Sequence, residues 1–182
     1  MTIKMTALRF RWAWTTLFAI AVFAVLAILD RELRARSGFG TLDLQSARTA
    51  KEVQTITTAW MLRGGAAGAG FNLGFDYLFM PLYGFAFYYS GLILRARFAP
   101  RPGIVRRIWS LAAAVPLAGA VLDAGENALE ASMLFGRPTD IIAAYAYAVS
   151  SAKWLCIFFG LVLLLGAIVT LFIKRKAESE PA

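Results

Sequence analysis

Long apolar runs alternate with short polar segments along this chain of 182 residues. Each run comes close to or exceeds the roughly 20 residues that an α-helix needs to cross the hydrocarbon core of a membrane. The pattern therefore predicts an all-α integral membrane protein, a four-transmembrane-helix bundle that forms one domain over residues 1–182. The predicted spans cover about residues 12–30, 71–94, 108–128 and 141–173.

The only sizeable segment outside these runs is the loop of residues 31–70. Thr49 and Glu52 form a capping-box pattern there, ahead of apolar residues that recur every three or four positions. We predict a short amphipathic helix that either lies on the membrane surface or caps the bundle. Its apolar face would carry Val53, Ile56, Trp60 and Met61. The glycine-rich stretch 63–70 lacks the ending of a phosphate loop, so it is read as a flexible joint or a packing surface.

The composition agrees with a membrane location, because 59% of the residues are hydrophobic and only 16% are charged. A soluble domain usually carries about 25% charged residues. Basic residues precede the first apolar run, but the run exceeds the roughly 7–15 residues of a signal-peptide core, and no A-x-A site follows it. We therefore predict a retained first span.

Basic residues also set the predicted orientation. With the N-terminus inside, the inner segments carry eleven of them and the outer segments seven, six of these on the long loop. This bias predicts a multi-pass protein of a bacterial-type inner (plasma) membrane, with both termini in the cytoplasm. The net charge of +8 then reflects topology and contact with anionic lipid, and no nucleic-acid partner is expected.

Two features are expected to deform the spans. Pro81 and Pro116 are predicted to kink spans two and three at similar depths. Span four is longer than a membrane requires, so its outer part should tilt, project outward or break near Ser150 and Ser151.

Polar side chains gather at one predicted depth. Counting about 20 residues from each inner boundary places the outer ends of the spans near Asp30, Asp76, Asn127 and Lys153. Asn72 and Asp76 share a face that continues to Tyr83, while Pro116, Gly119, Asp123, Glu126 and Glu130 form one stripe on span three. Ala146, Ser150 and Lys153 form the matching line on span four. These faces predict an acidic layer in the outer leaflet, inside the bundle.

The cost of burying charge makes this layer a candidate site. One charged side chain in the membrane centre costs roughly 2.5–3.5 kcal/mol, and intramembrane carboxylates are usually functional. We take Asp76, Asp123 and Glu126 as the candidate catalytic residues, with Asn72, Asn127, Lys153, Tyr83 and Asp30 as candidate ligand-binding residues. Protonation, an arginine from the outer loop (Arg31, Arg34 or Arg63), or a bound cation would balance the acidic surplus. A purely structural ion pair of Lys153 with Asp123 or Glu126 is the alternative.

The chain has no histidine and one cysteine, Cys156, which argues against haem and zinc. Carboxylates suit Mg²⁺ or Ca²⁺, so a divalent cation is the cofactor that the layer would accept, although no metal motif is present. The aromatic block "FDYLFMPLYGFAFYY" either lines a groove for an acyl chain or packs the helices together.

Three functions fit these features. The first is binding of a membrane lipid headgroup or a cation at the acidic layer, with or without modification of the lipid. The second is a small proton- or cation-coupled transporter, although transport sites usually lie nearer the membrane centre. The third is a non-catalytic subunit of a homo-oligomer or larger membrane complex. The sequence does not decide whether the protein is an enzyme.

Overall fold

The computed structural model describes the backbone of residues 5–179 and the side chains of residues 5–172. Every regular element in that range is a helix, as the sequence predicts. The helices are α1 (Met5–Ser37), α2 (Thr41–Ser46), α3 (Ala50–Leu62), α4 (Ala66–Phe98), α5 (Ile104–Phe135) and α6 (Asp140–Ser179). Four of them, α1, α4, α5 and α6, are long and apolar enough to cross a membrane.

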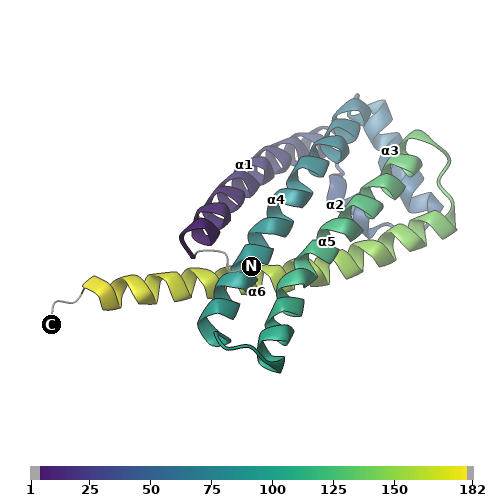
Figure 1. Cartoon of the computed structure of the whole chain (residues 1–182). Coiled ribbons are helices and arrows are strands. Elements are labelled where there is room, and N and C mark those ends of the chain that lie inside the picture. Colours follow the sequence, from purple (N-terminus) through teal and green to yellow (C-terminus); the bar gives the residue numbers. More distant parts are fainter. Residues whose placement is uncertain (1–4, 180–182) are drawn as a thin grey trace.

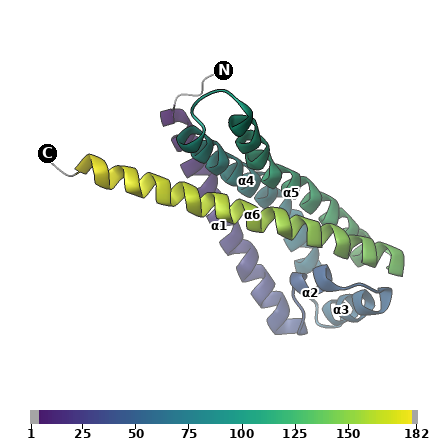
Figure 2. The ribbon, with the colours of Figure 1, turned by 90° about the horizontal axis from the view of Figure 1, so that it is seen from below.

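The four long helices are built around the antiparallel pair α4 and α5. Helix α1 packs mainly on α4, whereas α6 packs along both α5 and α4 (Figure 1). Seen from the second direction, α6 runs obliquely across the bundle, and its C-terminal part extends beyond the other helices (Figure 2). Helices α1 and α6 therefore share little contact, and part of α4 lies open between them.

The long helices extend past the predicted spans and do not break. Of the three alternatives predicted for span four, the break does not occur, because α6 continues through Ser150 and Ser151 and instead runs tilted across the other helices (Figure 2). Helices α4 and α5 also continue through Pro81 and Pro116. A proline removes one backbone donor, and the packed neighbours hold the rest of the helix in place.

The amphipathic helix of the first loop is confirmed as α3, and it caps the bundle. Thr49 and Glu52 form the capping box that the sequence predicts. Trp60 is fully buried, and its indole N–H donates to the carbonyl of Phe39 at 2.9 Å. Met61 is exposed, which corrects its predicted place on the apolar face, and Thr57 is buried instead. The six-residue helix α2 was not predicted, because its segment reads as a turn.

The core consists of three apolar clusters stacked along the bundle. The upper cluster lies at the end of the bundle that α2 and α3 cover. It joins α3 to the ends of α4, α5 and α6 and includes Trp60, Leu73 and Met133. The middle cluster contains Ala19, Met80, Tyr83 and Phe87. The lower cluster lies at the other end, around Ala113 and Leu163. By their order along α4, α5 and α6, the polar side chains fall between the upper and middle clusters.

Small residues bring the helices close together below this polar layer. A Cβ atom on Gly91 of α4 would lie 2.6 Å from the Cβ of Ala113 on α5. A Cβ atom on Gly119 of α5 would lie 2.7 Å from the Cβ of Cys156 on α6. This close approach agrees with the small-residue stripe predicted for α5 and holds the polar faces of the helices against each other.

Candidate functional site

A buried ion pair network occupies the centre of the polar layer. The ammonium group of Lys153 on α6 lies 3.1 Å from Oδ1 of Asp123 and 2.5 Å from Oε2 of Glu126, both on α5. All three side chains are almost completely shielded from solvent. The helical spacing of three residues turns Asp123 and Glu126 toward the same neighbour, so one lysine serves both carboxylates.

Helix α4 completes the network from the other side. The hydroxyl of Tyr83 donates to Oδ2 of Asp123 at 2.9 Å, so both oxygens of Asp123 have partners. The side-chain amide of Asn127 donates to Oδ2 of Asp76 at 3.0 Å and to the carbonyl of Leu73 at 3.1 Å. Side chains from α4, α5 and α6 thus converge at one level, as the sequence predicts.

Glu130 is an additional buried acid that the candidate set lacks. It follows Glu126 by one helical turn and is completely buried, yet neither carboxyl oxygen has a hydrogen-bond partner among the described residues. The side-chain nitrogen of Asn72 is also buried without such a partner. Glu130 belongs to the polar stripe predicted for span three. The lack of a hydrogen-bond partner for its carboxyl group, among the described residues, becomes visible only when the neighbouring helices are in place.

Asp30 has a different environment from the rest of the predicted set. Its Oδ1 accepts hydrogen bonds from the backbone N–H of Thr41, at 2.5 Å, and from the hydroxyl of Thr41, at 2.8 Å. Asp30 therefore fixes the start of α2, and no contact joins it to Asp123 or Lys153 among the described hydrogen bonds and ion pairs. The sequence places Asp30 at the right depth but cannot show which way the following loop turns.

The outer-loop arginines do not balance the acidic layer. Arg34 pairs with Asp43 at 2.8 Å, and Arg31 and Arg63 lie exposed on the surface. The layer holds four carboxyl groups, those of Asp76, Asp123, Glu126 and Glu130, against the single ammonium of Lys153. Because a buried carboxylate without a partner is strongly unfavourable, protonation and a bound cation are the two remaining ways to balance this acidic surplus.

An apolar groove reaches the polar layer from the side. It has a volume of about 300 Å³ and lies where α1 and α6 leave α4 open, with Phe23, Phe79, Phe87 and Leu161 among its lining residues. The ring of Tyr83 also lines it, and the hydroxyl of the same residue binds Asp123. Part of the aromatic block therefore lines an apolar groove, and other residues of the block pack against neighbouring helices.

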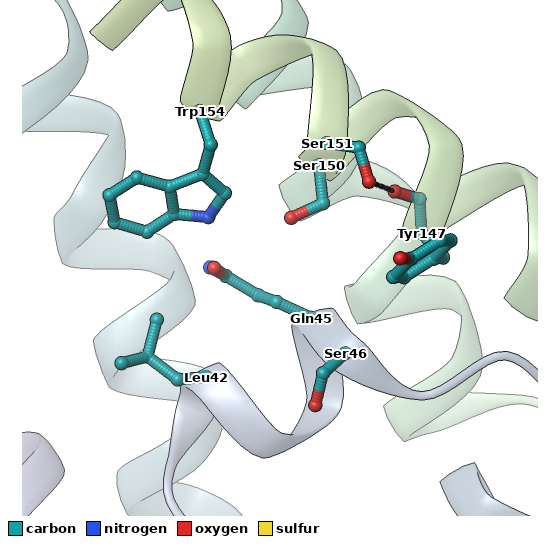
Figure 3. A pocket seen from close by; sticks show the side chains of 7 residues that line it. All are labelled: Leu42, Gln45, Ser46, Tyr147, Ser150, Ser151 and Trp154. Carbon is teal, nitrogen blue, oxygen red and sulfur yellow. Dashed lines mark hydrogen bonds between the residues drawn. The ribbon is translucent and has the colours of Figure 1, made fainter. Parts of the chain in front are cut away.

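A second, smaller cavity of about 140 Å³ lies between α2 and α6, on the side of the capping helices. Gln45 and Leu42 of α2 face Ser150 and Trp154 of α6 across it (Figure 3). Trp154 lines both this cavity and the apolar groove, so one side chain borders the two hollows.

The described residues do not include a group of three or more histidine, cysteine or acidic side chains placed to hold a metal ion. Of the four acids in the layer, Asp76 contacts Asn127, Asp123 contacts Tyr83 and Lys153, and Glu126 contacts Lys153, whereas Glu130 has no such contact among the described residues. No family model, curated protein or solved structure matches this chain, so the function has to be inferred from the site itself.

Proposed function

We propose that this protein is a multi-pass protein of a bacterial-type inner membrane that binds one membrane lipid. An acyl chain lies in the groove between α1, α4 and α6, and the polar headgroup is held next to the acidic layer. In this arrangement both termini lie in the cytoplasm, in agreement with the excess of basic residues on the inner segments. The capping helices α2 and α3 then lie on the outer side.

The observation that carries this proposal is the junction at Tyr83. One face of its ring belongs to an apolar hollow large enough for part of an acyl chain, and its hydroxyl reaches a buried carboxylate. An amphiphile needs apolar and polar surfaces next to each other, and binding sites of this kind are mostly apolar with a few well-placed polar groups. A membrane supplies acyl chains at high concentration to a groove that opens on its side.

A purely structural ion pair explains less of the layer. Lys153, Asp123 and Glu126 alone would fix the register of α5 and α6, but the Glu130 carboxyl group and the Asn72 side-chain nitrogen remain buried without hydrogen-bond partners among the described residues. Transport is also less well supported, because the layer lies between two apolar clusters and near one end of the bundle. Lipid binding would use both the surplus carboxyl groups and the apolar groove, and it requires neither a nucleophile nor a metal.

Blocking the groove tests the proposal. We would purify the protein in a mild detergent and count the retained lipid molecules by native mass spectrometry. Leu161 lines the groove and is partly exposed, so Leu161→Trp should fill it and remove the bound lipid. Leu165→Trp is the matched control, because Leu165 is exposed on the same helix and does not line the groove.

The expected result is one retained lipid in the natural protein and in Leu165→Trp, with loss of that lipid in Leu161→Trp. Equal retention in the two variants would show that lipid associates with the whole apolar surface and that the groove is not a binding site. Thermal unfolding of both variants checks that the bundle is intact.

A further inference from the structure

We propose that the cavity between α2 and α6 binds the primary ammonium group of a phospholipid headgroup. This inference rests on the proposed lipid binding and identifies the class of lipid. The cavity is closed by α2 on one side and α6 on the other, so a ligand would lie between a loop helix and a long helix (Figure 3).

The cavity presents hydrogen-bond acceptors. The side-chain oxygen of Gln45 is shielded from solvent and has no hydrogen-bond partner among the described residues. In Figure 3 the amide group of Gln45 points across the cavity toward the indole of Trp154. The hydroxyl of Ser151 already donates to the carbonyl of Tyr147 at 2.9 Å, so its lone pairs remain available as acceptors. A primary ammonium has three N–H donors to match these oxygens.

Aromatic surface next to the acceptors favours a cation. Trp154 forms one wall, and the face of an indole ring attracts ammonium groups at short range. The ammonium of Lys153 also lies 5.4 Å from the centre of this ring, and its ion pairs with Asp123 and Glu126 offset the repulsion between it and a second ammonium.

The buried acids supply the electrostatic attraction. Ser150 lines the cavity and lies one helical turn from Lys153 on α6, whose ammonium pairs with the Glu126 carboxylate, so the cavity borders the acidic layer. Among the described residues that layer holds four carboxyl groups and one ammonium group, and in its low-dielectric surroundings an ionised carboxylate attracts a cation more strongly than it would in water. A positive ligand is therefore favoured over an anionic one in the depth of the cavity.

The rim of the cavity carries the opposite charge. The guanidinium of Arg48 donates to the hydroxyl of Tyr147 at 2.7 Å and lies 4.2 Å from the centre of its ring. Tyr147 lines the cavity, so Arg48 stands at its edge and can face a phosphate. A zwitterionic headgroup with its ammonium inside and its phosphate at Arg48 fits this charge pattern, and its acyl chain would pass Trp154 into the apolar groove.

Lipids that differ only in the headgroup test this inference. The intact protein would be titrated with phosphatidylethanolamine, phosphatidylcholine and phosphatidylglycerol of identical acyl chains, with binding followed by native mass spectrometry. We expect phosphatidylethanolamine to bind about tenfold more tightly than phosphatidylglycerol, the effect of one charge-assisted hydrogen bond. Phosphatidylcholine should bind less tightly than phosphatidylethanolamine, because its quaternary nitrogen has no N–H.

Two substitutions of Gln45 should move this preference in opposite directions. Gln45→Leu should abolish most of it by removing the acceptor, whereas Gln45→Glu should increase it by adding a negative charge. Gln54→Leu is the matched control, since Gln54 is exposed on α3, away from the cavity, and should change nothing. A substitution that only disturbed the fold would not strengthen binding. Tighter binding by Gln45→Glu therefore could not result from a loss of stability.

The outcomes separate this inference from the proposed function. Equal binding of the three lipids, unchanged by both Gln45 substitutions, would overturn the headgroup site and leave the acyl groove standing. No binding of any lipid would overturn both proposals. Soluble glycerophosphoethanolamine is expected not to bind at the same concentration. If it binds as tightly as the lipid, the ligand is a soluble amine and the lipid headgroup is the wrong source.

Discussion

The hydroxyl of Tyr83 donates a 2.9 Å hydrogen bond to Oδ2 of Asp123, while the ring of Tyr83 lines an apolar groove. This one contact connects the side of the bundle to its buried acids. Without it, the polar layer would be separated from the groove by aromatic packing alone. The account of the protein as a lipid-binding bundle depends on this connection between an apolar surface and a charged interior.

Lys153 should be the most sensitive position of the layer. Replacing it by methionine leaves Asp123 and Glu126 buried without their cation, which should lower the free energy of unfolding by about 3–5 kcal/mol. Thermal unfolding in detergent micelles measures this loss. Lys51→Met is the matched control, because Lys51 is exposed on α3.

Removing the uncompensated carboxylates should recover part of the free energy of unfolding that Lys153→Met loses. Adding Asp123→Asn and Glu126→Gln to Lys153→Met removes the uncompensated charges, so the triple variant should be more stable than the single one. If Lys153→Met were no less stable than Lys51→Met, the network would not exist in the folded protein.

Replacing Glu126 or Glu130 by leucine should change the free energy of unfolding in opposite directions. Glu130→Leu removes a buried group whose oxygens have no partner, so it should raise the free energy of unfolding by about 1–3 kcal/mol. Glu126→Leu removes a partner of Lys153 and should lower it. The melting temperatures of the two variants, measured side by side, check this. A similar fall in both would mean that Glu130 has a partner after all.

The glycine contacts between α4 and α5 give a test of the packing. Gly91→Ala places a methyl group against Ala113 and should cost about 1–3 kcal/mol, because neither backbone can move far in a packed bundle. Gly74→Ala, in open space on the same helix, should be neutral or stabilising by up to about 1 kcal/mol. Unfolding of both variants in the same detergent measures the difference. Equal effects would contradict the close approach.

The cap of α3 should respond to acid. The backbone N–H groups of Arg48 and Thr49 donate to Oε2 of Glu52, at 2.7 and 3.1 Å, and they hold the pKa of this exposed carboxyl below its ordinary value. A lowered pKa means that the ionised group stabilises the folded state. This contribution is complete above the ordinary pKa of about 4.3 and is lost as the pH falls through the lower folded value.

Hydrogen exchange of the α3 amides, compared with those of α4, measures this contribution. Glu52→Gln should weaken the protection of α3 at pH 7, and the two proteins should converge only once the pH falls below the lowered pKa of Glu52, where the natural carboxyl also becomes neutral. A difference that stays constant with pH would mean that the charge of Glu52 does not contribute to the cap.

The sequence predicts the features that repeat along a helix. The long apolar runs, the capping box at Thr49 and the shared faces of Asp76, Asp123, Glu126 and Lys153 all follow from helical spacing and from the cost of burying charge. The spacing of three residues turns Asp123 and Glu126 toward the same side of α5, where the ammonium of Lys153 on α6 contacts both.

Features that depend on how the chain folds back are not predictable in this way. The pairing of Asp30 with Thr41 depends on the path of a loop, and helix α2 is too short to leave a periodic pattern. The isolation of Glu130 and the groove beside Tyr83 depend on the relative placement of α1, α3 and α6. These are tertiary relationships, which single-sequence patterns do not contain.

The central claim is that one lipid lies in the groove beside Tyr83. The most direct measurement is photo-cross-linking with phosphatidylethanolamine that carries a diazirine on an acyl chain, followed by peptide mapping. We expect the cross-links to concentrate on groove residues such as Phe23, Phe87 and Leu161. Cross-links spread equally over exposed apolar residues elsewhere, such as Leu111 and Val121, would contradict the claim.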